Sequence, residues 1–145
     1  MGIESMVIEQ IQGDGYERVA KFKREDELPA VWCHFIQHDE YLEPGEEPQA
    51  LRSGCRVEGR FSIQLVLSCE PVHSDAQIGF KQELEASSHI EAVGRVTERL
   101  DDDEFIGDFG PLGDSVRVEL EQSLELEVGT LVRVKGNLEW EEADG

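Results

Sequence analysis

Three glycines lie inside segments whose alternation of apolar and polar residues is typical of β-strands. Gly59, Gly94 and Gly136 each fall on or beside the apolar positions of their segments. A glycine inside a strand weakens the hydrogen-bonded ladder, so it usually marks a bulge, a tight bend or the close approach of another backbone. Three such positions predict a strongly curved antiparallel sheet or a small barrel, and they disfavour a flat sandwich.

The longest alternating run lies between Gly54 and Val72. The residues that share one parity in this run are Val57, Gly59, Phe61, Ile63, Leu65, Leu67 and Cys69. Because successive side chains of a strand point to opposite faces, this pattern predicts one long strand or a bent pair, with this parity as the apolar face.

Further strands are predicted along the rest of the chain. They cover residues 6–12, 16–23, 30–38, 90–100, 104–109, 115–121 and 130–140. Gly13-Asp14-Gly15 and residues 110–114 are turns, and Asp101-Asp102-Asp103 is a hairpin turn into Glu104. Residues 80–86 fit a short strand or a helical turn equally well, and the tail from Glu141 to Gly145 is expected to fray. The predicted fold class is therefore all-β.

The length of the chain predicts a single compact unit over residues 1–145. A weak internal repeat suggests two similar four-strand halves, residues 6–72 and 80–141. In particular, residues 56–61 match residues 133–138 in character at nearly every step. Duplication is one interpretation, and the alternative is that any two four-strand meanders look alike over so short a match.

The C-terminal third resembles an OB-fold. The residues that carry the resemblance are the glycine-centred segment Ala92–Val96, the alternating strand 115–120 and the segment 129–138. The resemblance implies a five-stranded Greek-key barrel whose strand 2–3 face and flanking loops bind single-stranded nucleic acid or oligosaccharide. No fifth strand follows Trp140, so such a barrel would need one from the N-terminal half. Phe105 and Phe109 could stack on bases, but carboxylates surround them in the sequence.

Acidic side chains dominate the composition. The chain has 13 Lys and Arg against 33 Asp and Glu, a net charge of −20, and residues 73–145 alone carry 6 basic and 19 acidic side chains, or −13. Such a field repels nucleic acid and anionic membranes. It favours solubility, a basic protein partner or an environment of high salt, and strand edges left open could support a homo-oligomer.

The sequence contains no apolar run long enough to cross a bilayer and no apparent secretory signal. Cys33, Cys55 and Cys69 cannot all pair with one another, and reduced thiols fit a cytoplasmic protein. The expected location is therefore the cytoplasm.

One group of residues combines cations with an aromatic ring. Its members are Lys21, Lys23, Trp32, Arg56 and Arg60, with Phe22, Arg24 and Arg52 nearby in the sequence. The group could contact phosphates of a nucleic acid or another polymeric ligand. The competing interpretation is that these cations pair with the acidic second half or form an ordinary solvated face.

Metal binding and catalysis have little support in the sequence. Cys33, His34 and His38, or Cys69 and His73, lack the paired spacing of a zinc site, and Asp101–Glu104 lacks the spaced ligands of a calcium loop. None of the common hydrolase, metalloprotease or nucleotide-binding motifs is present. The sequence therefore predicts no metal, no cofactor and no enzyme.

Two functional hypotheses follow. The first is a non-catalytic, acidic β-barrel module that acts by protein–protein interaction, as an inhibitor or adaptor does, with Asp101, Asp102, Asp103 and Glu104 facing a basic partner. The alternative is an OB-like binder of single-stranded nucleic acid or another small polymeric ligand that uses Lys21, Lys23, Trp32, Arg56 and Arg60.

Overall fold

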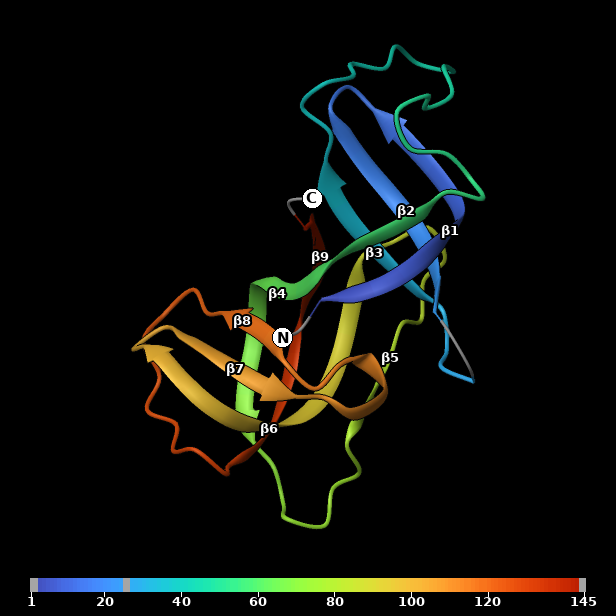
Figure 1. Cartoon of the computed structure of the whole chain (residues 1–145). Helices are drawn as coiled ribbons and strands as arrows, with labels where there is room; N and C mark the ends of the chain where they lie inside the picture. The colour runs from blue at the N-terminus through green and yellow to red at the C-terminus, as the bar shows by residue number, and fades with distance from the viewer. Residues whose placement is uncertain (1–2, 25–26, 144–145) are drawn as a thin grey trace.

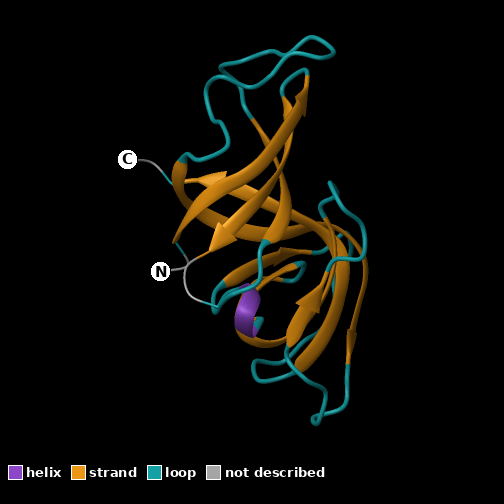
Figure 2. Cartoon of the chain, turned by 90° about the vertical axis from the view of Figure 1, so that its right-hand side faces the viewer, coloured by secondary structure: helices purple, strands orange, loops and turns teal. Residues whose placement is uncertain are grey.

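A computed structural model describes residues 3–24 and 27–143, and Figure 1 shows that they form an all-β molecule. The strands are β1 (Glu4–Asp14), β2 (Glu17–Arg24), β3 (Val31–Ile36), β4 (Arg56–Pro71), β5 (Gly79–Lys81), β6 (His89–Asp101), β7 (Glu104–Asp108), β8 (Val116–Glu119) and β9 (Leu131–Glu142). The helical element of the described residues is a short 3-10 turn, η1 (Gly110–Leu112), which Figure 2 shows between the upper and lower groups of strands. No helix in the described ranges has the length and apolar character needed to span a membrane.

Two long strands, β4 and β9, pair with each other in the middle of the molecule. They run antiparallel from the pair Gly59–Glu142 to the pair Pro71–Val132. On one side of them lies the meander β1-β2-β3, and on the other side lies the meander β6-β7-β8 (Figure 1). β4 and β9 therefore belong to both groups of strands.

Each meander closes into a ring by pairing with both long strands. β1 pairs antiparallel with β4, and β3 pairs parallel with β9 at His34 and Glu139, which completes the N-terminal ring. β6 pairs antiparallel with β9, and β8 pairs parallel with β4, which completes the C-terminal ring. All nine strands form one sheet, eight of them lie in a closed circuit, and β5 is attached only to β6. The predicted strongly curved, barrel-like β fold is confirmed.

The fifth strand of the C-terminal ring comes from the N-terminal half of the chain, as we expected because no fifth strand follows Trp140. β4 supplies it through the pairs Ser62–Arg117 and Ile63–Val118. In the same way, β9 from the C-terminal half completes the N-terminal ring. The two parallel pairings were not predicted, since alternation identifies a strand but not its partner.

The structure decides the conformation at the start of residues 80–86 and corrects the prediction for the C-terminal tail. Residues 80–86 contain the end of the short strand β5, so the strand alternative is the correct one at their start. Glu141 and Glu142 are not frayed: they belong to β9 and lie opposite Arg60 and Gly59. Residues 144 and 145 of the expected tail lie outside the described residues.

Alternation along the strands fills each ring with apolar side chains. In the N-terminal ring, Trp140 from β9 packs edge-on against Phe22 and Phe35, with ring centroids 5.1 and 5.0 Å apart. In the C-terminal ring, Phe105 and Phe109 are fully buried. The suggestion that the Phe105 and Phe109 side chains stack on bases is therefore wrong, because both side chains are packed inside the core.

The strand glycines allow side chains to cross the ring interiors. A Cβ atom on Gly94 would lie 2.5 Å from ring carbons of Phe109, and one on Gly59 would collide with the indole of Trp140. Both are the close approaches that a glycine inside a strand indicates. The prediction of tight curvature from these positions is confirmed.

Arg24 connects the two rings from inside the molecule. Its guanidinium donates from Nη1 to the carbonyl oxygen of Leu112 at 2.9 Å and from Nη2 to that of Pro29 at 2.9 Å. An ion pair of 3.6 Å with Glu4 balances its charge. Arg24 is only 4% exposed, so it does not belong to the surface cations with which the sequence grouped it.

Replacing Gly94 by alanine should destabilise the fold. The new methyl group would press on the buried Phe109 ring, and overpacking of this kind costs about 1–3 kcal/mol. Urea denaturation gives the free energy of unfolding, and Gly79→Ala is the matched control because a Cβ there meets nothing within 4 Å. Equal stability of the two variants would contradict the packing of Phe109 over Gly94.

Candidate functional site

The structure brings together part of the predicted cation–aromatic group. Lys21 on β2 and Trp32 on β3 are direct cross-strand partners on the outer face of the N-terminal ring. The Lys21 side chain is already engaged, because its Nζ forms an ion pair with Glu9 at 3.2 Å. The amide side chain of Gln82 accepts from Trp32 N at 2.8 Å and donates to Trp32 O at 2.7 Å. Gln82 therefore pairs with the backbone at the start of β3, and the Trp32 side chain is half-buried.

The other predicted cations are spread around the ring. Lys23 and Arg56 lie on either side of Val7, in the same row but on strands separated by β1. Arg56 donates a hydrogen bond to Ser5 Oγ at 3.2 Å. Arg60 lies farther along β4, opposite Glu141. Lys23 therefore shares the outer face of β2 with Lys21, whereas Arg56 and Arg60 lie on β4, beyond β1.

His34 forms a polar clasp where the N-terminal ring closes. Its Nδ1 lies 2.8 Å from Glu139 Oε1 on β9, and its Nε2 lies 3.1 Å from Glu17 Oε1 on β2. The hydrogen bond to Glu139 raises the pKa of His34 most, burial opposes it, and Glu17 adds to the increase. Protonated His34 therefore ties β3 to β9 and β2 at the single pair that joins β3 and β9.

The thiols of Cys33 and Cys69 are poor nucleophiles. Burial, and to a smaller degree Glu139, raise the pKa of Cys33 well above its usual value, and burial raises that of Cys69 to about 11. Because the thiolate is the reactive form, neither cysteine is activated at neutral pH. Among the described residues, no group of three or more His, Cys, Asp and Glu side chains is placed to hold a metal.

The predicted acidic hairpin packs against a second acidic segment. Leu120 N donates to Asp103 O at 2.7 Å, and Leu124 N donates to Asp102 O at 3.1 Å. Arg99 fixes this contact, since its Nη1 donates to the carbonyls of Leu124 and Leu126 and its Nη2 to those of Asp101 and Asp102. We call the exposed carboxylates of these two segments the acidic tip: Asp101, Asp102, Asp103, Glu121, Glu125 and Glu127.

The carboxylates of the acidic tip are exposed, and that of Asp101 accepts a hydrogen bond from Asp102 N at 2.8 Å. Within the described ranges none of the six forms an ion pair, because Arg99 is occupied by backbone carbonyls. Glu104, the fourth predicted residue of the hairpin, differs from the others: it is half-buried and pairs with Arg117 at 2.7 Å. Leu100 and Val128, in the same two segments, are exposed. The tip therefore combines unpaired negative charge with some apolar area.

A second surface was not anticipated by the sequence. β4 contains a bulge in which residues 65–67 lie opposite the single residue Gly136 of β9. Leu65 has a left-handed backbone, with φ of 51°, and its side chain is 63% exposed. Leu67 is 80% exposed, and Val66 between them is buried. We call Leu65 and Leu67 the β4 ridge.

The β4 ridge is costly for an isolated molecule. A left-handed conformation costs a non-glycine residue about 1–2 kcal/mol, and each leucine left in water forgoes about 1.5 kcal/mol or more of burial. The parity of the sequence predicted both side chains to be buried, and that prediction is wrong. Strained backbone that exposes apolar groups is often found at functional positions.

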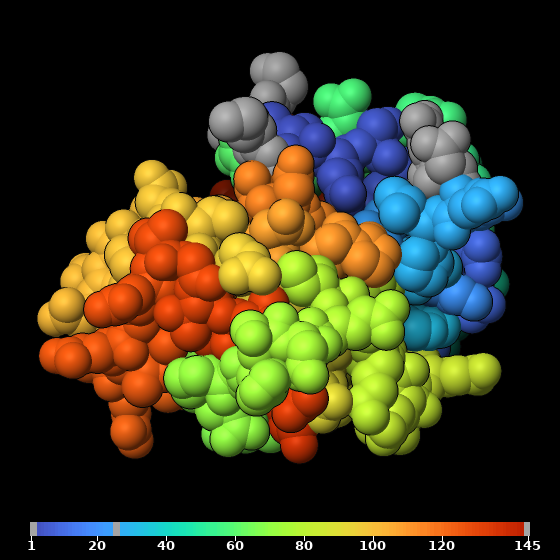
Figure 3. Space-filling view, turned by 90° about the horizontal axis from the view of Figure 1, so that it is seen from below, coloured from blue at the N-terminus to red at the C-terminus, as the bar shows by residue number. Residues whose placement is uncertain are grey.

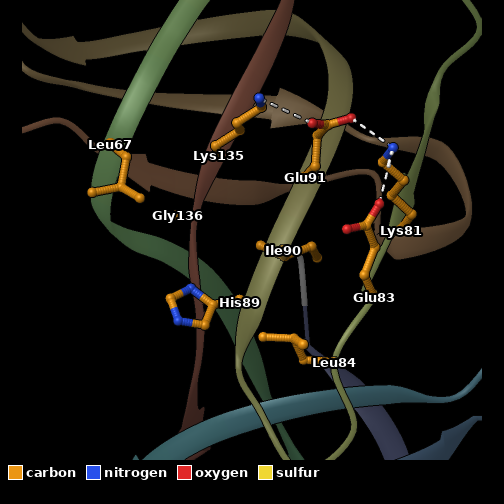
Figure 4. A pocket seen from close by; sticks show the side chains of 9 residues that line it. All are labelled: Leu67, Lys81, Glu83, Leu84, His89, Ile90, Glu91, Lys135 and Gly136. Carbon is orange, nitrogen blue, oxygen red and sulfur yellow. Dashed lines mark ion pairs between the residues drawn. The ribbon is translucent and has the colours of Figure 1, made fainter.

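A groove lies beside the β4 ridge. It encloses about 260 Å³ and is lined by Leu67, Lys81, Glu83, Leu84, His89, Ile90, Glu91, Lys135 and Gly136 (Figure 4). One part is apolar, with Leu84 58% exposed. The other part is a row of ion pairs across three strands, in which Glu91 binds Lys135 at 3.4 Å and Lys81 at 3.5 Å, and Lys81 also binds Glu83 at 3.5 Å.

Figure 3 shows how this region lies on the surface. The green-to-lime segment that includes the end of β4 lies between the orange-red segment around residues 120–130 and the yellow-green segment that contains β5. Leu67 also lines a second groove of about 240 Å³ on the side of residues 120–124. The β4 ridge therefore separates two hollows.

Comparisons of the chain with protein-family models, with curated proteins and with solved structures gave no match. The candidate surfaces therefore rest on the geometry of the chain itself.

One feature of the sequence could have indicated the β4 ridge. Leu65, Val66 and Leu67 are three consecutive apolar residues, so either parity could face the core from this point onward. Gly136, directly opposite, has room for the displaced backbone: a Cβ atom there would lie 2.9 Å from Gln64 O. A broken alternation opposite a strand glycine is the pattern of a bulge.

The clasp at His34 predicts a pH-dependent stability. Because the folded-state pKa of His34 is raised, its contribution is complete below the unfolded value near 6.5 and is lost as the pH rises through the folded pKa. We expect His34→Gln to lower the free energy of unfolding by about 1 kcal/mol at a pH of about 6, and by less at a pH of about 9.

Urea denaturation at both pH values measures this difference. His38→Gln is the matched control, because His38 forms no ion pair with a described residue. A loss of stability in His34→Gln that is the same at both pH values would contradict the clasp.

Proposed function

We propose that the protein is a non-catalytic interaction module, of the inhibitor or adaptor kind, that binds a basic partner protein through its acidic tip. The observation that carries the proposal is that six exposed carboxylates are held together on two packed segments without ion pairs. A partner that brings arginine or lysine side chains gains charge-assisted contacts there without breaking existing ones.

The construction of the tip supports a rigid binding surface. The hairpin after β6 is joined to residues 120–126 by two backbone hydrogen bonds and by the four carbonyl contacts of Arg99. A surface that is fixed before binding loses less conformational entropy on association. Leu100 and Val128 add apolar area of the type found at the centre of protein interfaces.

The raised pKa values of the Cys33 and Cys69 thiols support a non-catalytic role. Burial keeps Cys33 and Cys69 in the thiol form. His34, which contacts the carboxylates of Glu139 and Glu17, is engaged in closing the N-terminal ring.

The alternative is an OB-like binder of single-stranded nucleic acid. The adjacency of Lys21 and Trp32 on the outer face of β2 and β3 favours it, because a cation beside an aromatic ring is the arrangement that single-stranded nucleic-acid sites use. The ion pair of Lys21 with Glu9 and the spread of Lys23, Arg56 and Arg60 over the ring weaken it. The first proposal is therefore the better supported.

A labelled arginine-rich peptide should bind the acidic tip. We expect the triple variant Asp101→Asn, Asp102→Asn, Asp103→Asn to weaken binding about tenfold, and added salt to weaken binding to the wild type as well. Fluorescence anisotropy measures the affinity. The matched control removes the same charge from exposed residues of another loop, by Glu43→Gln, Glu46→Gln and Glu47→Gln.

Two outcomes would overturn the proposal. If both triple variants bind equally weakly, only net charge matters and the tip is not a site. If the peptide fails to bind at low salt while a labelled single-stranded oligonucleotide binds and Trp32→Ala abolishes that binding, the OB-like alternative replaces it.

A further inference from the structure

We propose that the β4 ridge and the groove beside it form the interface of a homodimer, with the ridge of each copy seated in the groove of the other. This inference is independent of the acidic tip and does not rest on the proposed function. It starts from Leu65 and Leu67, which a strained bulge holds in solvent.

The shape of the region fits a second copy. Leu67 forms both a wall of the groove and part of the projecting ridge, and Leu84 and Ile90 provide an apolar surface beside it (Figure 4). A two-fold axis places the same patch on both subunits, so a projection next to a hollow can fill the hollow of its partner and be filled in return. Leu65 and Leu67 of both copies would then be buried in a single interface.

The charges of the groove fit the same partner. Lys135, Glu91, Lys81 and Glu83 alternate in sign along the row and sum to zero. A two-fold axis reverses the direction of the row in the second copy, so lysines of one copy can face glutamates of the other. A neutral patch is also where two molecules of net charge −20 can approach each other with the least repulsion.

A basic protein is a poorer occupant of this groove. The row offers its cations no net negative charge, because Lys81 and Lys135 offset Glu83 and Glu91. The unpaired carboxylates at the acidic tip are the better site for such a partner. The two surfaces therefore select partners of different chemistry.

The proposed dimer has a salt dependence of unusual sign. The ridge and groove associate mainly through apolar contact, while the remaining surfaces of the two acidic copies repel each other. Salt screens that repulsion, with a Debye length that falls from about 30 Å at 0.01 M to about 3 Å at 1 M. Dimerisation should therefore strengthen as salt is added, whereas binding of a basic peptide to the acidic tip should weaken.

Sedimentation velocity of the full chain over a range of protein concentrations tests the inference, at low salt and at about 1 M NaCl. We expect a monomer–dimer equilibrium that shifts towards the dimer at high salt. Leu67→Asp on the ridge and Leu84→Asp on the groove wall should each weaken the dimer about tenfold or more, because each places a charge in the apolar contact. Circular dichroism should show that both variants fold, since both side chains are exposed.

Leu100→Asp is the matched control, with the same residue types exchanged at an exposed position of the acidic tip. It should leave the dimer unchanged. A wild-type chain that stays monomeric at high salt, or a dimer that is indifferent to both Leu67→Asp and Leu84→Asp, would overturn the inference. Neither result bears on peptide binding at the acidic tip, so the two proposals can fail separately.

Discussion

The antiparallel pairing of β4 with β9 is the contact on which both rings depend. Without it the chain would consist of two separate three-stranded meanders, each lacking the two strands that close it. The exchange extends to the cores, because β9 brings Trp140 to the aromatic cluster of the N-terminal ring and β4 brings Ile63 to the strand pair with Val118. Neither half of the chain therefore holds a complete core of its own.

The shared ladder also explains why the surface of the molecule carries the β4 ridge. β4 presents one parity to the core from Val57 to Ile63 and then continues along β9 to Pro71. The extra residues at 65–67 change the parity, so that Val66 faces inward and its two neighbours face solvent. The bulge is thus the origin of both the strained backbone at Leu65 and the exposed leucines, which form the proposed dimer surface.

Much of the fold could be predicted from local pattern. Alternation predicted a strand over residues 16–23, where Ala20 and Phe22 lie inside and Lys21 and Lys23 outside, and the strand glycines indicated close approaches. The partners of the strands could not be predicted, because the pairing of β3 with β9 and of β8 with β4 joins residues far apart in the sequence. Alternation also failed at Leu65 and Leu67, where a bulge reverses the parity.

The candidate surfaces divide in the same way. The acidic hairpin was visible in the sequence as a run of like charges. Its packing against residues 120–127 depends on the tertiary hydrogen bonds of Arg99. Likewise Arg24 looked like one more surface cation, and only the folded chain shows it buried between the rings. Long-range packing, which no short motif encodes, decided both outcomes.

Native-state hydrogen exchange of the backbone amides tests the central role of the β4–β9 pairing most directly. If the two rings share that ladder as their common support, the slowest amides of β2 and of β7 should exchange with the same free energy as those of β4 and β9, because all require global unfolding. A C-terminal ring whose amides stay protected while those of the N-terminal ring exchange through a smaller opening would contradict the account. Equal protection across both rings would support it.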